Sequence, residues 1–421
     1  MTEAEAVNTV TTSDGTPKRL LNKTMLGIVA SETISAFGTQ MTFLAVPWFV
    51  LSTTGSASRM GLVFAVELLP IALLGMPSAL VVQRIGVRAT MLLADAVRGT
   101  LVLLIPILHL LGLLSFPVLL AVVFALGSCT APYLSAQRLI LPETFGDDQA
   151  LMTKGNALIE GGTRTAQLLG PAIAGLLITQ IGEINVLWFD AATYALSIAI
   201  LMLALPRSRR PLAATAAAPQ GGVFEGARFV LAHPLLRRVA AAALAFGTFF
   251  PILIATLPVL TVERFQANSA VAGALIGGWG AGALIGVFVV MRLASRIPPL
   301  KLGALAAVAV AAPLWLLPLP LTAWQSVLIL AVAGVSTPML NAPVITIILT
   351  RSPDRIRAKV IAFVMTANLL AGPAGYAVGG ALLERWGVTI PLILAAAGTS
   401  LAALLLTTML RVPDEAPPPQ N

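Results

Sequence analysis

The chain has 421 residues, of which 57% are hydrophobic and only 10% are charged, and its mean hydropathy is +0.92. A soluble domain carries about 25% charged residues. This composition excludes a soluble enzyme, a nucleic-acid-binding protein and a disulfide scaffold. The net charge of +8 does not by itself indicate binding to nucleic acid. The single cysteine, Cys129, and the two separated histidines, His109 and His233, indicate no metal site, and we expect no cofactor.

Twelve apolar runs long enough to cross a bilayer follow one another along the chain. A membrane-spanning helix needs about 20 apolar residues, and only helices or closed barrels satisfy their backbone groups in hydrocarbon. None of the runs alternates as barrel strands do, so we predict an all-α integral membrane protein with twelve transmembrane helices. The predicted spans are residues 24–50, 59–82, 90–113, 116–137, 156–179, 183–205, 238–261, 269–291, 302–321, 323–349, 358–382 and 388–410.

The segments outside the spans predict the domain organisation and the orientation. Lys and Arg concentrate on the side of the N-terminus, whereas the opposite segments hold only Arg59, Arg264 and Arg385. The positive-inside rule therefore places both termini on the cytoplasmic side of the membrane. The membrane itself is predicted to be the cell (inner or plasma) membrane. The predicted parts are a disordered tail (1–23), an N-terminal six-helix half (24–205), a cytoplasmic linker (206–237), a C-terminal six-helix half (238–411) and a second disordered tail (412–421).

The two halves repeat some features of each other. Gly170-Pro171 in the fifth span corresponds to Gly372-Pro373 in the eleventh, and Lys154 corresponds to Lys359. Two pseudo-repeat halves around a midplane cavity are an architecture that secondary transporters use for alternating access. Because the sequence has no GxxxxGK[ST] phosphate-binding loop, we expect the energy for transport to come from an ion or solute gradient. The chain is not predicted to be an enzyme.

Several segments carry a family resemblance. They are ISAFGTQMTFLAVPWFVLSTTGS in the first span, GMPSALVVQRIGVRATMLLADAVR between the second and third spans, LLGPAIAG in the fifth span and RIRAKV before the eleventh. Together they resemble the major facilitator superfamily, and within it the bacterial exporter branch with enterobactin exporter-like and macrolide efflux-like proteins. The resemblance covers about residues 20 to 411. Gln83 and Thr39 depart from it, since the family pattern has an acid at the first position and often at the second.

The resemblance implies two groups of functional residues. Arg84, Arg88, Asp95 and Arg98 fall in the loop motif and are expected to act in gating, whereas Gly170, Pro171 and Gly175 form the backbone of the antiporter motif. Asp95 and Arg98 are three residues apart on one helix, so they can form an ion pair. That pair is either a gate latch that breaks during transport or a static bond. Pro171 should bend its helix, because proline removes an amide donor.

Acidic residues inside spans are costly and are therefore candidates for function. Glu32 and Glu67 have no cation nearby in the sequence, and an acid in a low-dielectric site can bind and release protons near neutral pH. We predict that at least one of them couples transport to protons; the alternative is a neutral acid that only packs helices. Asp190 is expected to be a feature of the start of the sixth helix.

Other polar residues are candidates for lining a substrate cavity. Glu160 and Arg164 are four residues apart in the favourable order for a helical ion pair, and they form either a polar cavity wall or part of a wet inner vestibule. Gln40, Asn341 and Asn368 are further candidates, because amides rarely face lipid.

The sequence thus predicts a secondary active transporter that exports a small hydrophobic or amphipathic organic molecule in exchange for protons. Its expected partners are this substrate, protons and the lipid bilayer, with no nucleic acid, and we expect it to work as a monomer. The direction of transport follows from the family resemblance. An uptake carrier or uniporter, and a non-transporting membrane sensor or scaffold on the same fold, remain as alternatives.

Overall fold

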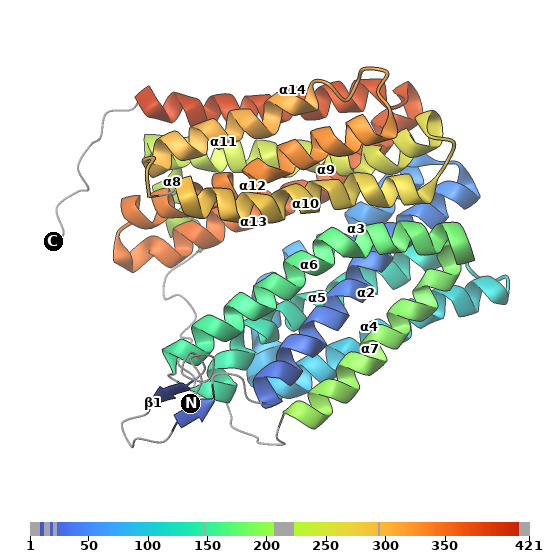
Figure 1. The fold of residues 1–421 in the computed structure, drawn as a ribbon, viewed down its shortest axis with the longest axis horizontal. Helices are drawn as coiled ribbons and strands as arrows, with labels where there is room; N and C mark the ends of the chain where they lie inside the picture. Colours follow the sequence, from blue (N-terminus) through green and yellow to red (C-terminus); the bar gives the residue numbers. More distant parts are fainter. Residues whose placement is uncertain are drawn as a thin grey trace. The chain divides into compact units, whose positions relative to one another are not determined.

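A computed structural model of the chain describes residues 9–11, 17–19, 23–146, 148–205, 223–293 and 295–411. These residues are predominantly helical (Figure 1). Two three-residue strands, β1 (Thr9–Thr11) and β2 (Pro17–Arg19), pair antiparallel in the N-terminal segment. The rest of the predicted N-terminal tail, the predicted C-terminal tail and much of the predicted linker lie outside the described residues.

In the described part of the chain, twelve helices of 16 to 33 residues overlap the twelve predicted spans, although their ends differ from the predicted ones. They are α2 (Lys23–Thr54), α3 (Ala57–Ile85), α4 (Val87–Leu110), α5 (Phe116–Phe145), α6 (Gln149–Ile181), α7 (Glu183–Ala204), α9 (Pro234–Arg264), α10 (Ser269–Leu293), α11 (Pro299–Leu314), α12 (Ala323–Arg351), α13 (Asp354–Trp386) and α14 (Thr389–Thr407). A short helix, α8 (Val223–Ala232), lies within the predicted linker, and a 3-10 turn, η1 (Thr408–Arg411), follows α14. The predicted all-α fold is confirmed.

Ten helices among the described residues are long and apolar enough to cross a membrane. Polar and charged residues such as Glu160, Arg164 and Gln167 interrupt the apolar sequence of α6, which is not among the ten. Helix α11 has only 16 residues, or about 24 Å at 1.5 Å per residue, which is less than the hydrocarbon core of about 30 Å. Both helices still occupy the positions of predicted spans.

The chain divides into two compact units. The first unit comprises Met1–Thr42, Leu74–Gly170 and Asn185–Thr215, and the second comprises Phe43–Leu73, Pro171–Ile184 and Ala216–Asn421. The divisions fall inside α2, α3 and α6, so each of these helices contributes one end to each unit, and a further division falls two residues into α7. The division in α6 falls between the two residues of the Gly170-Pro171 pair.

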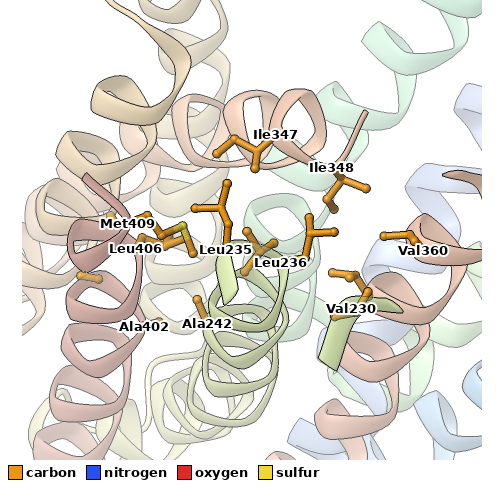
Figure 2. Close-up of a cluster of buried hydrophobic side chains, with 14 of the residues drawn as sticks. Val230, Leu235, Leu236, Ala242, Ile347, Ile348, Val360, Ala402, Leu406 and Met409 are labelled. Atoms are coloured by element: carbon orange, nitrogen blue, oxygen red, sulfur yellow. The ribbon is translucent and has the colours of Figure 1, made fainter. Parts of the chain in front are cut away.

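Most of the second unit is a bundle of the last six long helices. Helix α9 packs against α13 and α14, and α12 packs against α10 and α11; these helices run side by side in Figure 1. Leu236 of α9, Ile348 of α12 and Val360 of α13 belong to a buried apolar cluster, drawn in Figure 2. Because lipid chains are as apolar as these residues, van der Waals packing stabilises the cluster more than escape from water does.

The first unit has its own apolar core. Met25 of α2, Met91 of α4, Ile140 of α5 and Leu201 of α7 are buried together in one cluster. The turn that joins α3 to α4 places Gly86 at a φ of 85°, which residues with a side chain rarely adopt. This turn fixes the point at which the motif predicted to act in gating enters α4.

Candidate transport site

A buried ion pair lies in α4 of the first unit. Nη2 of Arg98 donates to Oδ1 of Asp95, and the two side chains are 3% and 0% exposed. Ser197 of α7 donates a 2.7 Å hydrogen bond to the other Asp95 oxygen, and Ser35 of α2 donates to Oδ1 over 3.4 Å. The predicted pairing therefore forms, and it connects α4 to α2 and α7.

The Arg98 guanidinium lies over two aromatic rings. Its Cζ atom is 4.0 Å from the ring centre of Tyr133 in α5 and 4.9 Å from that of Tyr194 in α7. A desolvated cation over an aromatic ring gains about 2 kcal/mol or more. Sequence reasoning missed Tyr133, Tyr194 and Ser197. The available signal was composition, because the chain has only three tyrosines.

Glu32 lies in α2 of the first unit and is 2% exposed. Gln137 of α5 donates a hydrogen bond from its amide nitrogen to Glu32 Oε2. The Tyr133 hydroxyl is near enough to interact with the same carboxyl group, and Arg98 acts on it electrostatically without forming an ion pair. Neither Glu32 Oε1 nor the Tyr133 hydroxyl has a hydrogen-bond partner among the described residues. Since buried polar atoms are usually paired, this local arrangement is unusual.

The polar residues of α2 form a stripe along one face of the helix. Ser31 shares a 2.7 Å hydrogen bond with Ser197, and Thr39 shares one of 3.1 Å with the Tyr194 hydroxyl. Ser31, Ser35 and Thr39 are four residues apart, which is the spacing of side chains on one helical face. The stripe therefore brings α2 into the same polar network as the ion pair of α4.

Asp190 is a second buried acid of the first unit. The Thr42 hydroxyl donates to its Oδ2, and the Thr193 hydroxyl donates to its Oδ1 over 3.1 Å. Asp190 is 0% exposed and lies in the interior of α7, not at its start as expected from the sequence. Gly38 faces this carboxyl group so closely that a side chain at position 38 would collide with it. The hydropathy pattern did not reveal this, because one of the two partners, Thr42, comes from another helix.

The two other residues predicted to act in gating flank the turn between α3 and α4. Arg88 donates to the backbone oxygen of Met202 in α7 over 3.5 Å. Arg84 is exposed at the end of α3 and makes no hydrogen bond or ion pair with the described residues. The structure thus brings Asp95 and Arg98 together in the core and leaves Arg84 and Arg88 apart from them.

The antiporter-motif residues occupy close helix contacts. A Cβ atom at Gly170 would lie 2.6 Å from the Cβ of Gln40 in α2, so these two predicted residues are neighbours in the first unit. Gly175 faces the backbone of Ser269 and Gly273 in α10, within the second unit. Ser269 donates a 3.0 Å hydrogen bond to the Gly175 oxygen. Small residues permit such close approach between helices in membranes.

Glu160 and Arg164 form the ion pair expected from their spacing, with 2.8 Å between Arg164 Nη2 and Glu160 Oε1. Their side chains are 63% and 47% exposed. Arg164 also donates to Gln167 over 3.0 Å. The three residues form a polar strip along α6.

The second unit contains a seam between α3 and α13. Their backbones meet at Gly61 and Gly380, where a Cβ atom on Gly61 would lie 2.7 Å from the Cα of Gly380. One helical turn further along, the rings of Phe64 and Tyr376 stack with their centres 4.8 Å apart. Glu67, the second predicted proton-coupling acid, is half-buried in α3 and interacts electrostatically with Tyr376.

A carboxylate terminates this seam. Glu384 Oε2 accepts 3.0 Å hydrogen bonds from the backbone N–H of Ser58 and from the Ser56 hydroxyl, at the N-terminus of α3. A negative charge is favourable there, because the first N–H groups of a helix are unpaired and its dipole is positive at that end. Sequence reasoning missed Glu384, since its partners lie more than 300 residues away.

The candidate amide Asn368 lines a cavity inside the second unit. The cavity has a volume of about 240 Å³ and is lined by residues of α9, α11, α12, α13 and α14. Asn368 Nδ2 donates a 2.7 Å hydrogen bond to the backbone oxygen of Ala243. Asn341 lies in α12, but its side chain is outside the described part of the structure.

Helix α8 is bound to the start of α13 by charge. Glu225 forms ion pairs with Lys359 and with Arg355, the latter 3.1 Å long. Gly226 lies against the backbone of Lys359, where a Cβ atom would be 2.6 Å from its oxygen. The predicted linker therefore contains an ordered helix that contacts the second unit.

Long apolar helices that bury the Asp95–Arg98 ion pair and the acids Glu32 and Asp190 define a multi-pass membrane protein of the secondary transporter class. The family model of the Major Facilitator Superfamily matches residues 28–372, and the chain belongs to this family. The protein is therefore a transporter and not an enzyme, and the resemblance inferred from its motifs is confirmed.

Relatives of known function include efflux pumps. The chain is 29% identical over 374 residues to the multidrug efflux pump Tap of Mycolicibacterium fortuitum, covering 86% of this chain and 90% of the relative. It is 28% identical over 379 residues to Tap of Mycobacterium tuberculosis, covering 86% and 87%. Among solved structures, the nucleoside transporter NupG has a TM-score of 0.75 at 12% identity, covering 92% of this chain and 99% of that chain. This last likeness shows the fold alone.

Proposed function

We propose that the chain is a proton-coupled exporter of small hydrophobic or amphipathic organic molecules that works by alternating access. Its similarity to the multidrug efflux pump Tap over 86% of its length supports export. The buried carboxyl group of Glu32 is the observation that carries proton coupling. We further propose a plasma-membrane location with both termini in the cytoplasm, on the basis of the Lys and Arg distribution, and a functional monomer.

Glu32 has the surroundings that a reversible proton carrier needs. Burying a charge without a counter-ion costs far more than burying a neutral hydrogen-bonded group. The Tyr133 hydroxyl beside it can donate to a carboxylate or accept from a carboxylic acid. We propose that this hydroxyl serves as the hydrogen-bond partner of Glu32 in both protonation states. Glu67, next to Tyr376 in the second unit, is the second candidate for the same role.

The polar network provides a route by which proton uptake acts on helix packing. Glu32 and Asp95 are linked through the residues around Arg98, and Asp95 in turn binds Ser197 of α7. We propose that protonation of Glu32 changes the electrostatic field at Arg98. This change alters the strength of the ion pair between Arg98 and Asp95. In this proposal Asp95 and Arg98 form a gate latch, and Arg84 and Arg88 act at the cytoplasmic end of the same motif.

Two groups of polar residues are proposed to line the substrate path. Glu160 and Arg164 offer an exposed polar strip on α6. Gln40 lies against Gly170, next to the bend expected at Pro171. We assign to the Gly170, Pro171 and Gly175 backbone the role of a close, bending contact that limits leakage.

Reconstituted vesicles provide the test. The purified protein would be placed in liposomes with an imposed pH gradient, and movement of a fluorescent hydrophobic cation such as ethidium would be followed together with internal pH. We expect the rate of pH-driven dye transport by the Glu32→Gln variant to be at least tenfold lower than that of the wild type. Dye exchange driven by the dye gradient alone should be retained.

The matched control is Glu263→Gln, which removes an exposed carboxylate at the end of α9. It should transport at the wild-type rate. Wild-type proton-driven transport by both Glu32→Gln and Glu67→Gln would reject the coupling assignment, and accumulation against the expected direction would favour an uptake carrier.

A further inference from the structure

The cavity of the second unit is lined mainly by apolar side chains, with Asn368 and Thr399 as the polar ones. Alanines contribute at five positions, including Ala242 of α9, Ala307 of α11 and Ala402 of α14. Figure 2 shows Ala242 and Ala402 at one side of the apolar cluster. Because alanine is short, it leaves space that larger aliphatic residues would fill. No Asp, Glu, Lys or Arg side chain is among the lining residues.

The Asn368 amide is part of the cavity lining and is fixed by a hydrogen bond. The backbone oxygen of Ala243 can only accept, so the Asn368 atom that binds it must be the nitrogen. The amide oxygen Oδ1 then receives no hydrogen bond from the described residues. Gly247 of α9 leaves room for the amide, because a Cβ atom there would lie 2.9 Å from Asn368 Nδ2.

We propose that this cavity binds a small uncharged ring molecule that carries one N–H or O–H donor. The ring occupies the alanine-lined space, and its donor binds Asn368 Oδ1. That this ligand is also a transported substrate rests on the proposed function. That the cavity binds it is independent of the proposed function.

Charge and size both narrow the ligand class. An ionised group would lose its hydration in a cavity without a counter-ion, which is strongly unfavourable. In another protein an apolar cavity of about 150 Å³ stays dry and binds benzene. The larger cavity of about 240 Å³ has room for a fused two-ring molecule such as indole.

The test compares two probes of one shape. Indole has a ring N–H donor, and indene has a CH₂ group in its place. Binding of each would be measured by equilibrium dialysis against the full chain in lipid nanodiscs, with empty nanodiscs to subtract partition into lipid. We expect saturable binding of one molecule per chain. Since a net hydrogen bond contributes about 0.5–1.5 kcal/mol, indole should bind about 3- to 10-fold more tightly than indene.

Variants separate the ring site from the donor site. Ala307→Leu fills the cavity and should weaken binding of both probes at least tenfold. Ala312→Leu is the matched control, because Ala312 lies on the same helix but is exposed. Asn368→Leu should remove the preference for indole and leave indene binding within twofold of wild type.

Three results would overturn the proposal. They are equal affinity for the two probes in the wild-type protein, unchanged binding in Ala307→Leu, and no saturable binding at all. Transport without binding at this cavity would reject the site and keep the proposed function. Binding without transport of either probe would keep the site and reject its role in export.

Discussion

Gly61 of α3 and Gly380 of α13 lie in backbone contact, and a Cβ atom on Gly61 would be 2.7 Å from both the Gly380 Cα and the Tyr376 oxygen. The obstructing atoms belong to the backbone and cannot rotate away as a side chain can. This contact joins a helix of the N-terminal half of the sequence to one of the C-terminal half.

Alanine at either glycine should therefore disturb the seam. Overpacking of a tight contact costs about 1–3 kcal/mol, so Gly61→Ala and Gly380→Ala should each lower the thermal unfolding midpoint in detergent. They should also slow dye transport severalfold.

Gly75→Ala serves as the comparison for this pair. Gly75 lies on the same helix as Gly61, and a Cβ atom there would meet no neighbouring atom of the described residues within 4 Å. Unaltered midpoints and rates in both seam variants would show that the two helices separate freely at this point.

The Glu384 contact with the N-terminus of α3 should contribute measurably to stability. Loss of a side chain that caps a helix N-terminus costs about 1 kcal/mol. Glu384→Ala should therefore lower the free energy of unfolding by about that amount, and Glu384→Gln by less, since its amide oxygen still accepts from Ser58. Unfolding in increasing concentrations of SDS would measure this. If the wild type, Glu384→Ala and Glu384→Gln were equally stable, solvent would satisfy the Ser58 N–H as well as Glu384 does.

The buried pair of Asp95 and Arg98 should behave as a coupled unit. Removing one partner of a buried pair leaves the other charge uncompensated and costs about 3–5 kcal/mol. Asp95→Asn and Arg98→Gln should each destabilise the protein strongly, but the double variant should lose much less than the two effects added together. A double-mutant cycle on unfolding free energies measures the coupling. Additive losses would argue that the two side chains act independently.

The attachment of α8 should depend on pH in the acidic range only. A hydrogen bond from Lys359, together with the charges of Lys359 and Arg355, holds the pKa of Glu225 below its ordinary value of 4.5. A carboxyl group with a lowered pKa stabilises the folded form above its unfolded-state pKa, and this contribution is lost as the pH falls through the folded-state pKa. Docking of α8 should thus stay constant from neutral pH to about 4.5 and weaken below it.

A spin label at position 228, where Arg228 is exposed on α8, would report this change as increased mobility. In Glu225→Gln the label should be mobile at all pH values. A label that remains immobile in Glu225→Gln would show that apolar packing alone holds α8.

Local spacing and hydropathy were sufficient to predict the helices and two of the ion pairs. Asp95 with Arg98 and Glu160 with Arg164 are three and four residues apart, so the helix itself brings them together. The twelve spans followed from apolar length. The helix α8 was not predicted as a separate element, because it is only 10 residues long.

The groups around these pairs could not be predicted in the same way. Tyr133 and Ser197 reach the ion pair from α5 and α7, and Glu384 reaches α3 from α13. Such contacts depend on how each helix is rotated about its axis, and the uniformly apolar spans carry little periodic signal from which to read that rotation. Long-range pairing therefore required the three-dimensional arrangement.

The regular order of residues on α13 has a consequence for sequence change. Gly372, Tyr376, Gly380 and Glu384 recur every four positions along the edge that meets α3. Inserting or deleting a single residue between them would turn the remainder of the helix by about 100° and direct the following members elsewhere. This stretch should consequently accept many point replacements on its other sides, yet reject any change in its length.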